Sequence, residues 1–172
     1  MPRKVLIFDT SILCVWLRLP GMTTCGPGGD KWDCARVDAK LHAEEKAQTT
    51  FVLPLAAIIE TGNHISQSGG DRFKLAQALG AVMRNAADSA TPWAAFSAQS
   101  ELWSDNQVRA LADTWPPLAA QQISLGDATI SQVAEYYALA GYAVELLTAD
   151  QGLKAYEPAK PVAIPRRRAN KA

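Results

Sequence analysis

Cysteine is scarce in this sequence, and its spacing excludes two classes of protein. There are three cysteines, Cys14, Cys25 and Cys34, and no CxxC pair. An odd number without such a pair argues against a disulfide framework and against a zinc ribbon. Cys14 falls in an apolar helical pattern and is expected in the core. Cys25 and Cys34 flank a glycine-rich loop, and His42 follows further along the chain. This pattern has two interpretations, an irregular metal site or two reduced thiols in a surface insertion.

Long apolar runs and nucleotide-binding motifs are also lacking. Polar residues interrupt every apolar stretch well before the roughly 18 residues of a membrane span, and the run near the start is too short for a signal peptide. Neither GxGxxG nor a P-loop pattern occurs, which leaves nucleotide-cofactor chemistry without support. We therefore expect a soluble, cytoplasmic protein with no membrane partner and no nucleotide cofactor.

The formal net charge is zero, but the charges are unevenly spread. The segment 166–172, "RRRANKA", holds four basic residues and no acid, so residues 1–165 carry 13 basic and 17 acidic groups, a net charge of −4. We expect a basic, disordered tail at 166–172, and contact between that tail and nucleic acid is the alternative.

The order of the expected elements indicates an α/β domain over residues 1–165. Apolar runs predict strands at 4–8, 51–54 and 143–148, with a last edge strand at 160–165. Helical spacing predicts helices at about 10–19, 35–48, 54–66, 71–88 and 127–140, the last ended by Gly141, and a helix near 105–115 that Pro116 and Pro117 break. A loop insertion is expected at about 20–34. Strands alternating with helices favour a three-layer α/β/α sandwich with a central, mainly parallel sheet.

Two predicted strands end on aspartates. Asp9 follows the strand 4–8 and Asp150 follows the strand 143–148. The carboxyl ends of parallel strands share one edge of a sheet, where open α/β sheets bind ligands. Each acid also has a plain structural reading as a helix N-cap, and Ser124 with Asp127 has capping-box spacing.

Glu60 lies in the helical stretch "PLAAIIETGNHIS". The apolar stripe predicted there is Leu55, Ile58, Ile59, Gly62 and Ile65, and Glu60 points away from it, beside small residues. The pattern leaves two placements open, a solvated face or a cleft. If Asp9, Glu60, Asp127 and Asp150 converge, their mutual repulsion calls for a cation, and hard oxygen ligands select Mg²⁺ or Mn²⁺. Such ions can promote phosphodiester hydrolysis by water.

Three motifs and their order resemble the PIN-domain family of metal-dependent ribonucleases, which includes toxins of bacterial toxin-antitoxin pairs. The motifs are "FDTSIL", "IIETGNHI" and "GDATISQVAEYYALAGYAVELLTADQGL". The resemblance implies a PIN-like sandwich in which Asp9 and Asp127 ligate the metal. It also implies that Asp150 completes the shell directly or through water and that Glu60 holds a water on the metal. Ser11, Thr148 and Asn63 are the expected supporting residues.

The resemblance predicts a Mg²⁺- or Mn²⁺-dependent endoribonuclease that hydrolyses RNA. The alternative is a catalytically weak PIN-like module that binds RNA or protein. An antitoxin partner and a homodimer are common in the family, and the sequence leaves both open. A phosphatase of the haloacid-dehalogenase type would need a second aspartate at the position of Ser11. The insertion at 20–34 and the stretch Gly62 to His64 depart from the family pattern.

Overall fold

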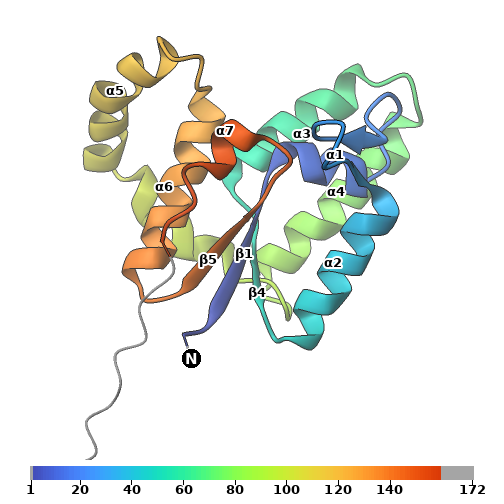
Figure 1. The fold of residues 1–172 in the computed structure, drawn as a ribbon, viewed down its shortest axis with the longest axis horizontal. Coiled ribbons are helices and arrows are strands. Elements are labelled where there is room, and N and C mark those ends of the chain that lie inside the picture. Colours follow the sequence, from blue (N-terminus) through green and yellow to red (C-terminus); the bar gives the residue numbers. More distant parts are fainter. Residues whose placement is uncertain (1, 160–172) are drawn as a thin grey trace, which may run out of the picture.

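A computed structural model describes residues 2–159 of the chain (Figure 1). The predicted edge strand at 160–165 and the basic tail at 166–172 lie outside the described residues. The fold is mixed α/β. Its elements are β1 (Lys4–Phe8), α1 (Thr10–Trp16), β2 (Thr24–Cys25), β3 (Trp32–Asp33), α2 (Cys34–Lys46), β4 (Thr50–Val52), α3 (Leu55–Gln67), α4 (Arg72–Ala87), the 3₁₀ helix η1 (Phe96–Trp103), α5 (Asp105–Ala119), α6 (Leu125–Leu139), β5 (Ala143–Leu147) and α7 (Gln151–Lys154).

The central sheet has three parallel strands in the order β4-β1-β5. Val5 to Ile7 of β1 pair with residues 50–52, and Lys4 to Phe8 pair with residues 143–147. The three predicted strands that lie within the described residues, and their parallel direction, are therefore confirmed. All three strands point the same way, so their carboxyl ends lie together at the upper edge of the sheet in Figure 1.

The central strand is buried on both faces because its side chains alternate between two cores. Leu6 and Phe8 pack in one cluster with apolar residues of α1, α2 and α4. Val5 and Ile7 pack in a second cluster with residues of α6. Helices thus cover both sheet faces, with α6 on one side and α2 and α4 on the other (Figure 1). This arrangement is compatible with the expected α/β/α sandwich.

Two segments differ from the prediction. The helix α1 ends at Trp16 and not at Leu19, because Arg18 adopts a left-handed conformation with φ of 59° that stops the helix. The segment predicted as a loop over Gly21 to Asp33 contains the antiparallel pair β2 and β3. Gly26 has φ of 94° at the end of β2, and a Cβ there would stand 2.4 Å from the carbonyl oxygen of Asp30, so the hairpin needs glycine.

The prediction that Pro116 and Pro117 break the helix is wrong. Both lie inside α5, which continues to Ala119. Proline's fixed φ is close to the helical value, and what it removes is an N–H donor. The two carbonyls left without that donor belong to Ala112 and Asp113, which are exposed and open to water. By contrast, the predicted left-handed stop at Gly141 is confirmed by its φ of 88°.

An ion network ties α2 to the opposite, amino-terminal edge of the sheet. Glu44 of α2 is only 7% exposed and accepts hydrogen bonds from Lys4, Lys40 and Thr49. The two lysines also contact Glu145 of β5. Burial raises the pKa of Glu44, but these hydrogen bonds outweigh burial and lower it to about 2.

Among the helices of the described residues, not one combines the length and the apolar character that crossing a bilayer requires.

Candidate functional site: a carboxylate cluster at the sheet edge

Asp9 stands at the carboxyl end of the central strand and is held there by three donors. It is the N-cap of α1 and is 6% exposed. Its Oδ1 accepts from the backbone N–H of Thr10 at 2.6 Å. Its Oδ2 accepts from the hydroxyls of Ser11 at 2.6 Å and Thr148 at 2.8 Å. Ser11 and Thr148 therefore fix the orientation of the Asp9 carboxylate, the supporting role that was expected of them.

Thr148 links Asp9 to Asp150. It follows β5, the neighbour of β1 in the sheet, and its Oγ1 also accepts the backbone N–H of Asp150 at 2.9 Å. Asp150 is exposed and is the N-cap of α7, where its Oδ1 accepts from Gly152 at 2.7 Å and Leu153 at 3.3 Å. The pairing of β1 with β5 thus brings the two strand-end aspartates to one edge.

Glu60 is half-buried and points toward Thr10 and Gly126, so it does not lie on a fully solvated face. Its Oε2 accepts from the Thr10 hydroxyl at 2.8 Å. Its Oε1 lies so close to Gly126 of α6 that a Cβ at that glycine would stand only 2.0 Å from this oxygen. The predicted apolar stripe of α3 is partly wrong: Ile59 is exposed, and the buried face is Ala57, Thr61 and Ile65. Glu60 is next to Thr61, at the margin of that face.

The pKa of Asp127 is affected by the other three carboxylates of the cluster. Asp127 is half-buried in the first turn of α6, and its backbone N–H donates to the Ser124 hydroxyl at 2.9 Å. Burial raises the pKa of Asp127, and the negative charges of Asp9, Asp150 and Glu60 raise it further, against a hydrogen bond with Ser124 that lowers it. Four acids from four elements therefore share one electrostatic site.

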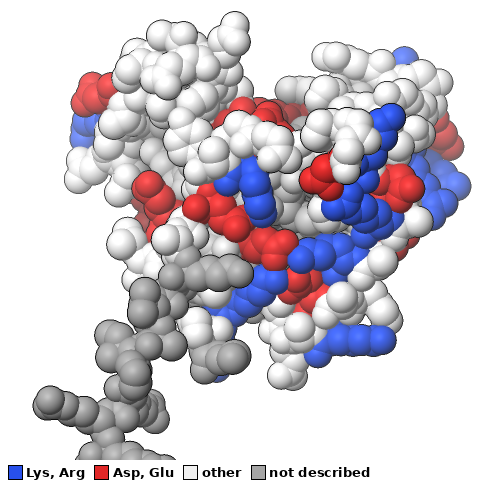
Figure 2. Space-filling view, in the orientation of Figure 1, with Lys and Arg blue, Asp and Glu red and all other residues white. Residues whose placement is uncertain are grey.

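No lysine or arginine of residues 2–159 forms a salt bridge with any of these four acids. Figure 2 shows acidic side chains gathered at the upper edge of the sheet, between the two halves of the molecule. Negative charges without a paired cation disfavour one another's ionised form. The cluster therefore favours any cation that can enter it.

The donor set matches the preferences of a hard divalent cation. Carboxylates and hydroxyls surround the cluster, and these oxygen ligands suit Mg²⁺ and Mn²⁺. Within the described part of the chain, however, no three His, Cys, Asp or Glu side chains are arranged to hold one ion together. Cys25 and Cys34 also have different partners, Ser11 for the first and Arg18 for the second. The residue types and charges fit a divalent ion, and its full coordination would need side-chain movement.

Asn63 and His64 are not brought into this cluster. Both are exposed on α3, and no hydrogen bond among residues 2–159 joins either side chain to the four carboxylates. The capping interpretation is confirmed for Asp9, Asp150 and Ser124. Asp9 and Asp150 cap helices and also lie in the carboxylate cluster, so the capping role does not exclude a role in the cluster.

Sequence reasoning missed Thr10 and Gly126, which together place the Glu60 carboxylate. It also missed Cys25, which lies near Ser11; burial raises the pKa of Cys25, and the neighbouring Ser11 lowers it in part. Gly126 directly precedes Asp127, but no local pattern in the sequence identifies it as the neighbour of Glu60. Nothing in the sequence signals the contact of Cys25.

No family model matches the chain, and neither the curated proteins nor the solved structures include one that is significantly similar to it.

Proposed function

We propose that this chain is a divalent-metal-dependent endoribonuclease of the PIN-domain type. One observation carries the proposal: the Asp127 carboxylate lies within the fields of Asp9, Asp150 and Glu60, at the carboxyl edge of a parallel sheet. Clusters of carboxylates without a paired cation are costly unless a cation or a proton offsets them. The order of these acids along the chain, which resembles that of the PIN-domain family, supports the same assignment.

In this proposal Asp9, Asp127, Asp150 and Glu60 hold Mg²⁺ or Mn²⁺. When bound, the ion supplies activation of water and stabilisation of the leaving oxygen of a phosphodiester. Ser11 and Thr148 keep the Asp9 carboxylate oriented, while Thr10 and Gly126 allow Glu60 to approach Asp127. The substrate is RNA, and the products carry a 5′-phosphate and a 3′-hydroxyl. Antitoxin pairing and dimerisation stay predictions of the family resemblance.

A PIN-like module that binds RNA or protein without cutting is the second candidate. It is favoured by the absence, within residues 2–159, of three acidic or other ligating groups already arranged around one ion. The three hydrogen bonds that Asp9 accepts also occupy lone pairs that an ion would need. Cleavage assays separate this candidate from the nuclease.

The test is cleavage of end-labelled RNA and DNA pools with EDTA, Mg²⁺ or Mn²⁺. We expect RNA cleavage only with a divalent ion. Asp127→Asn should reduce the rate by more than about 100-fold, because even residues that only support metal ligands cost about 10- to 100-fold. Asp113→Asn, at an exposed position of α5, is the matched control and should cut like the unmodified chain. Cutting that persists in EDTA, or in Asp127→Asn at the full rate, would show that the assignment is wrong.

A further inference from the structure

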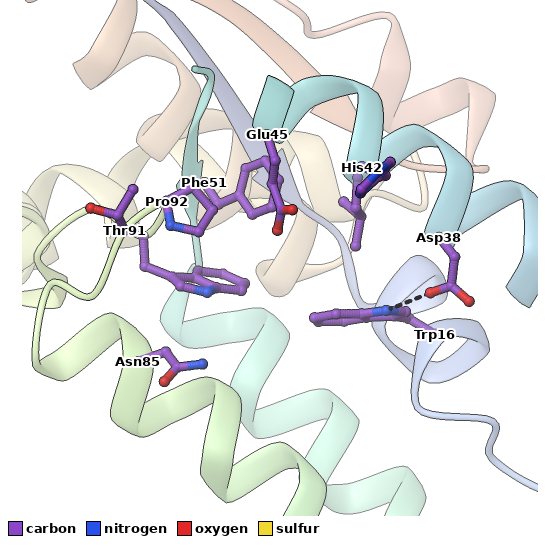
Figure 3. Close-up of a pocket in the computed structure, with 10 residues that line it drawn as sticks. Trp16, Asp38, His42, Glu45, Phe51, Asn85, Thr91 and Pro92 are labelled. Carbon is purple, nitrogen blue, oxygen red and sulfur yellow. Dashed lines mark hydrogen bonds between the residues drawn. The ribbon is translucent and has the colours of Figure 1, made fainter. Parts of the chain in front are cut away.

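A concave site lies away from the carboxylate cluster, between α2 and α4. It is a hollow of about 550 Å³, and it is lined by Trp16, Asp38, Leu41, His42, Glu45, Phe51, Asn85, Thr91, Pro92 and Trp93 (Figure 3). This volume falls within the range of about 300–1,000 Å³ typical of small-molecule sites. None of the residues proposed for RNA cleavage lines it.

The aromatic residues of this hollow are held in fixed positions. The rings of Phe51 and Trp93 pack edge to face with centroids 5.6 Å apart, and Phe8 contacts Phe51, Trp93 and Trp16 from the core. The Trp16 indole N–H donates to Asp38 at 3.1 Å, which fixes the orientation of that ring. The rings that form the floor of the hollow are therefore fixed, with Phe51 2% and Trp93 7% exposed and Trp16 half-buried as the most open of the three.

The polar side of the hollow is acidic. Asp38, His42 and Glu45 follow one another at i, i+4 and i+7 on α2, which places them on one face of the helix. In Figure 3 they reach over the rings from one side, and Asn85 lies on the other side. No lysine or arginine is among the lining residues, and no cation of residues 2–159 forms a salt bridge with Glu45.

These charges decide which ligand class fits. A nucleotide could stack on the tryptophans, but its phosphate would meet two carboxylates and no cation. A cation is attracted both by the carboxylates and by the faces of the aromatic rings, tryptophan above all. Asp38 already accepts the indole N–H of Trp16, so Glu45 is the carboxylate available to the ligand. A guanidinium is planar, stacks on aromatic rings and donates to a carboxylate as a fork.

We propose that this hollow binds a small guanidine compound, with the guanidinium lying on the aromatic floor and donating to Glu45. Asn85 offers a further hydrogen-bonding group on the opposite wall. The proposal does not depend on the nuclease activity, because the hollow and the carboxylate cluster share no residue.

The test is a titration of the full chain with agmatine at low salt, without divalent ions, followed through the five tryptophan indole N–H signals in NMR spectra. Trp→Phe variants assign these signals. We expect the Trp16 and Trp93 signals to shift along one saturating curve, while those of Trp103 and Trp115 stay in place. Glu45→Gln should weaken binding about tenfold or more, as loss of a charge-assisted hydrogen bond predicts. Glu45 is exposed, so this variant should fold normally.

Glu101→Gln, an exposed acid of η1 outside the hollow, is the matched control and should bind agmatine like the unmodified chain. Two further titrations use tetramethylammonium, a cation without N–H donors, and adenosine monophosphate. Agmatine should bind more tightly than either. Four outcomes would overturn the proposal: no saturable shift, equal binding by Glu45→Gln, tighter binding of tetramethylammonium, or tighter binding of the nucleotide.

Discussion

At the scale of single residues, the Thr148 hydroxyl connects Asp9 with Asp150. It donates to the Asp9 carboxylate and accepts the backbone N–H of Asp150, so one oxygen atom joins the ends of two strands. The side chain is buried, so removal of the hydroxyl would leave its hydrogen-bonding partners unpaired. The placement of both aspartates therefore depends on a neutral residue.

Replacing Thr148 by valine keeps its shape and removes that oxygen. We expect Thr148→Val to lower the free energy of unfolding by about 1–3 kcal/mol, the cost of leaving buried polar groups unpaired. Urea denaturation measures this loss. Thr148→Ser retains the hydroxyl and is the control, and it should recover most of the stability. Equal stability of the two variants would mean that the hydroxyl contributes nothing at this position.

A substitution at Gly126 tests the position of the Glu60 carboxylate while Glu60 and Asp127 both remain in the chain. In Gly126→Ala the new Cβ would stand 2.0 Å from the Glu60 Oε1, so the carboxylate must move away. Because the obstacle is the end of a flexible side chain and alanine favours helices, we expect unchanged or slightly higher thermal stability. RNA cleavage should fall at least about tenfold, because misplacement of a reacting group by about 1 Å can cost about 100-fold.

Gly80→Ala is the control for this substitution. Gly80 lies inside α4, where the nearest atom to an added Cβ is a nitrogen of Arg84 at 3.6 Å. This variant should gain up to about 1 kcal/mol in stability and keep its cleavage rate. A Gly126→Ala variant that cuts RNA at the full rate would remove Glu60 from the proposed mechanism.

At the scale of elements, the Glu44 network fixes α2 to the sheet. The pKa of Glu44 is lowered to about 2, from about 4.5 in an unfolded chain. A carboxyl with a depressed pKa stabilises the fold above its unfolded pKa, and this contribution is lost as the pH falls from about 4.5 to about 2. It amounts to at most about 3 kcal/mol, and to less than that because both lysines remain partly exposed.

Glu44→Gln should therefore be less stable than the unmodified chain at pH 7, and its stability should fall less steeply between pH 4.5 and pH 2. Denaturant unfolding over this pH range measures both effects. Glu45→Gln removes the neighbouring, exposed acid and should follow the unmodified profile. Parallel pH profiles for all three proteins would contradict the role assigned to Glu44.

The elements also show which parts of the structure the sequence could predict. The strands were predictable because continuous apolar runs such as Val5 to Phe8 fit a sheet that is buried on both faces. The continuation of α5 through two prolines was not predictable, because it depends on backbone carbonyls that are exposed to water. The β2–β3 hairpin was not predictable either, because it consists of only two residue pairs. At the site, the strand ends predicted Asp9 and Asp150. The place of Glu60 depended on a tertiary contact with Gly126, which no local pattern contains.

At the scale of the whole molecule, the negative charges of Asp9, Asp150 and Glu60 disfavour ionisation of Asp127, and a bound divalent ion would relieve this repulsion. We expect Mg²⁺ or Mn²⁺ to raise the melting temperature through mass action, by the equivalent of about 1.4 kcal/mol at ten times the dissociation constant. Asp127→Asn should be more stable than the unmodified chain in EDTA and should respond less to the ion. A melting temperature that ignores both ions would favour four independent helix caps.

The order of the strands has a consequence for the making of this protein. Synthesis starts at the amino terminus, so Asp9 and Glu60 leave the ribosome early, whereas β5, the partner of β1 along its whole length, comes only with residues 143–147. Asp127, Thr148 and Asp150 are also late. A nascent or prematurely terminated chain that lacks residues 143–150 therefore has no assembled carboxylate cluster. The cluster therefore assembles only after the segment 143–150 has been synthesised, although two of its four acids, Asp9 and Glu60, precede that segment by more than 80 residues.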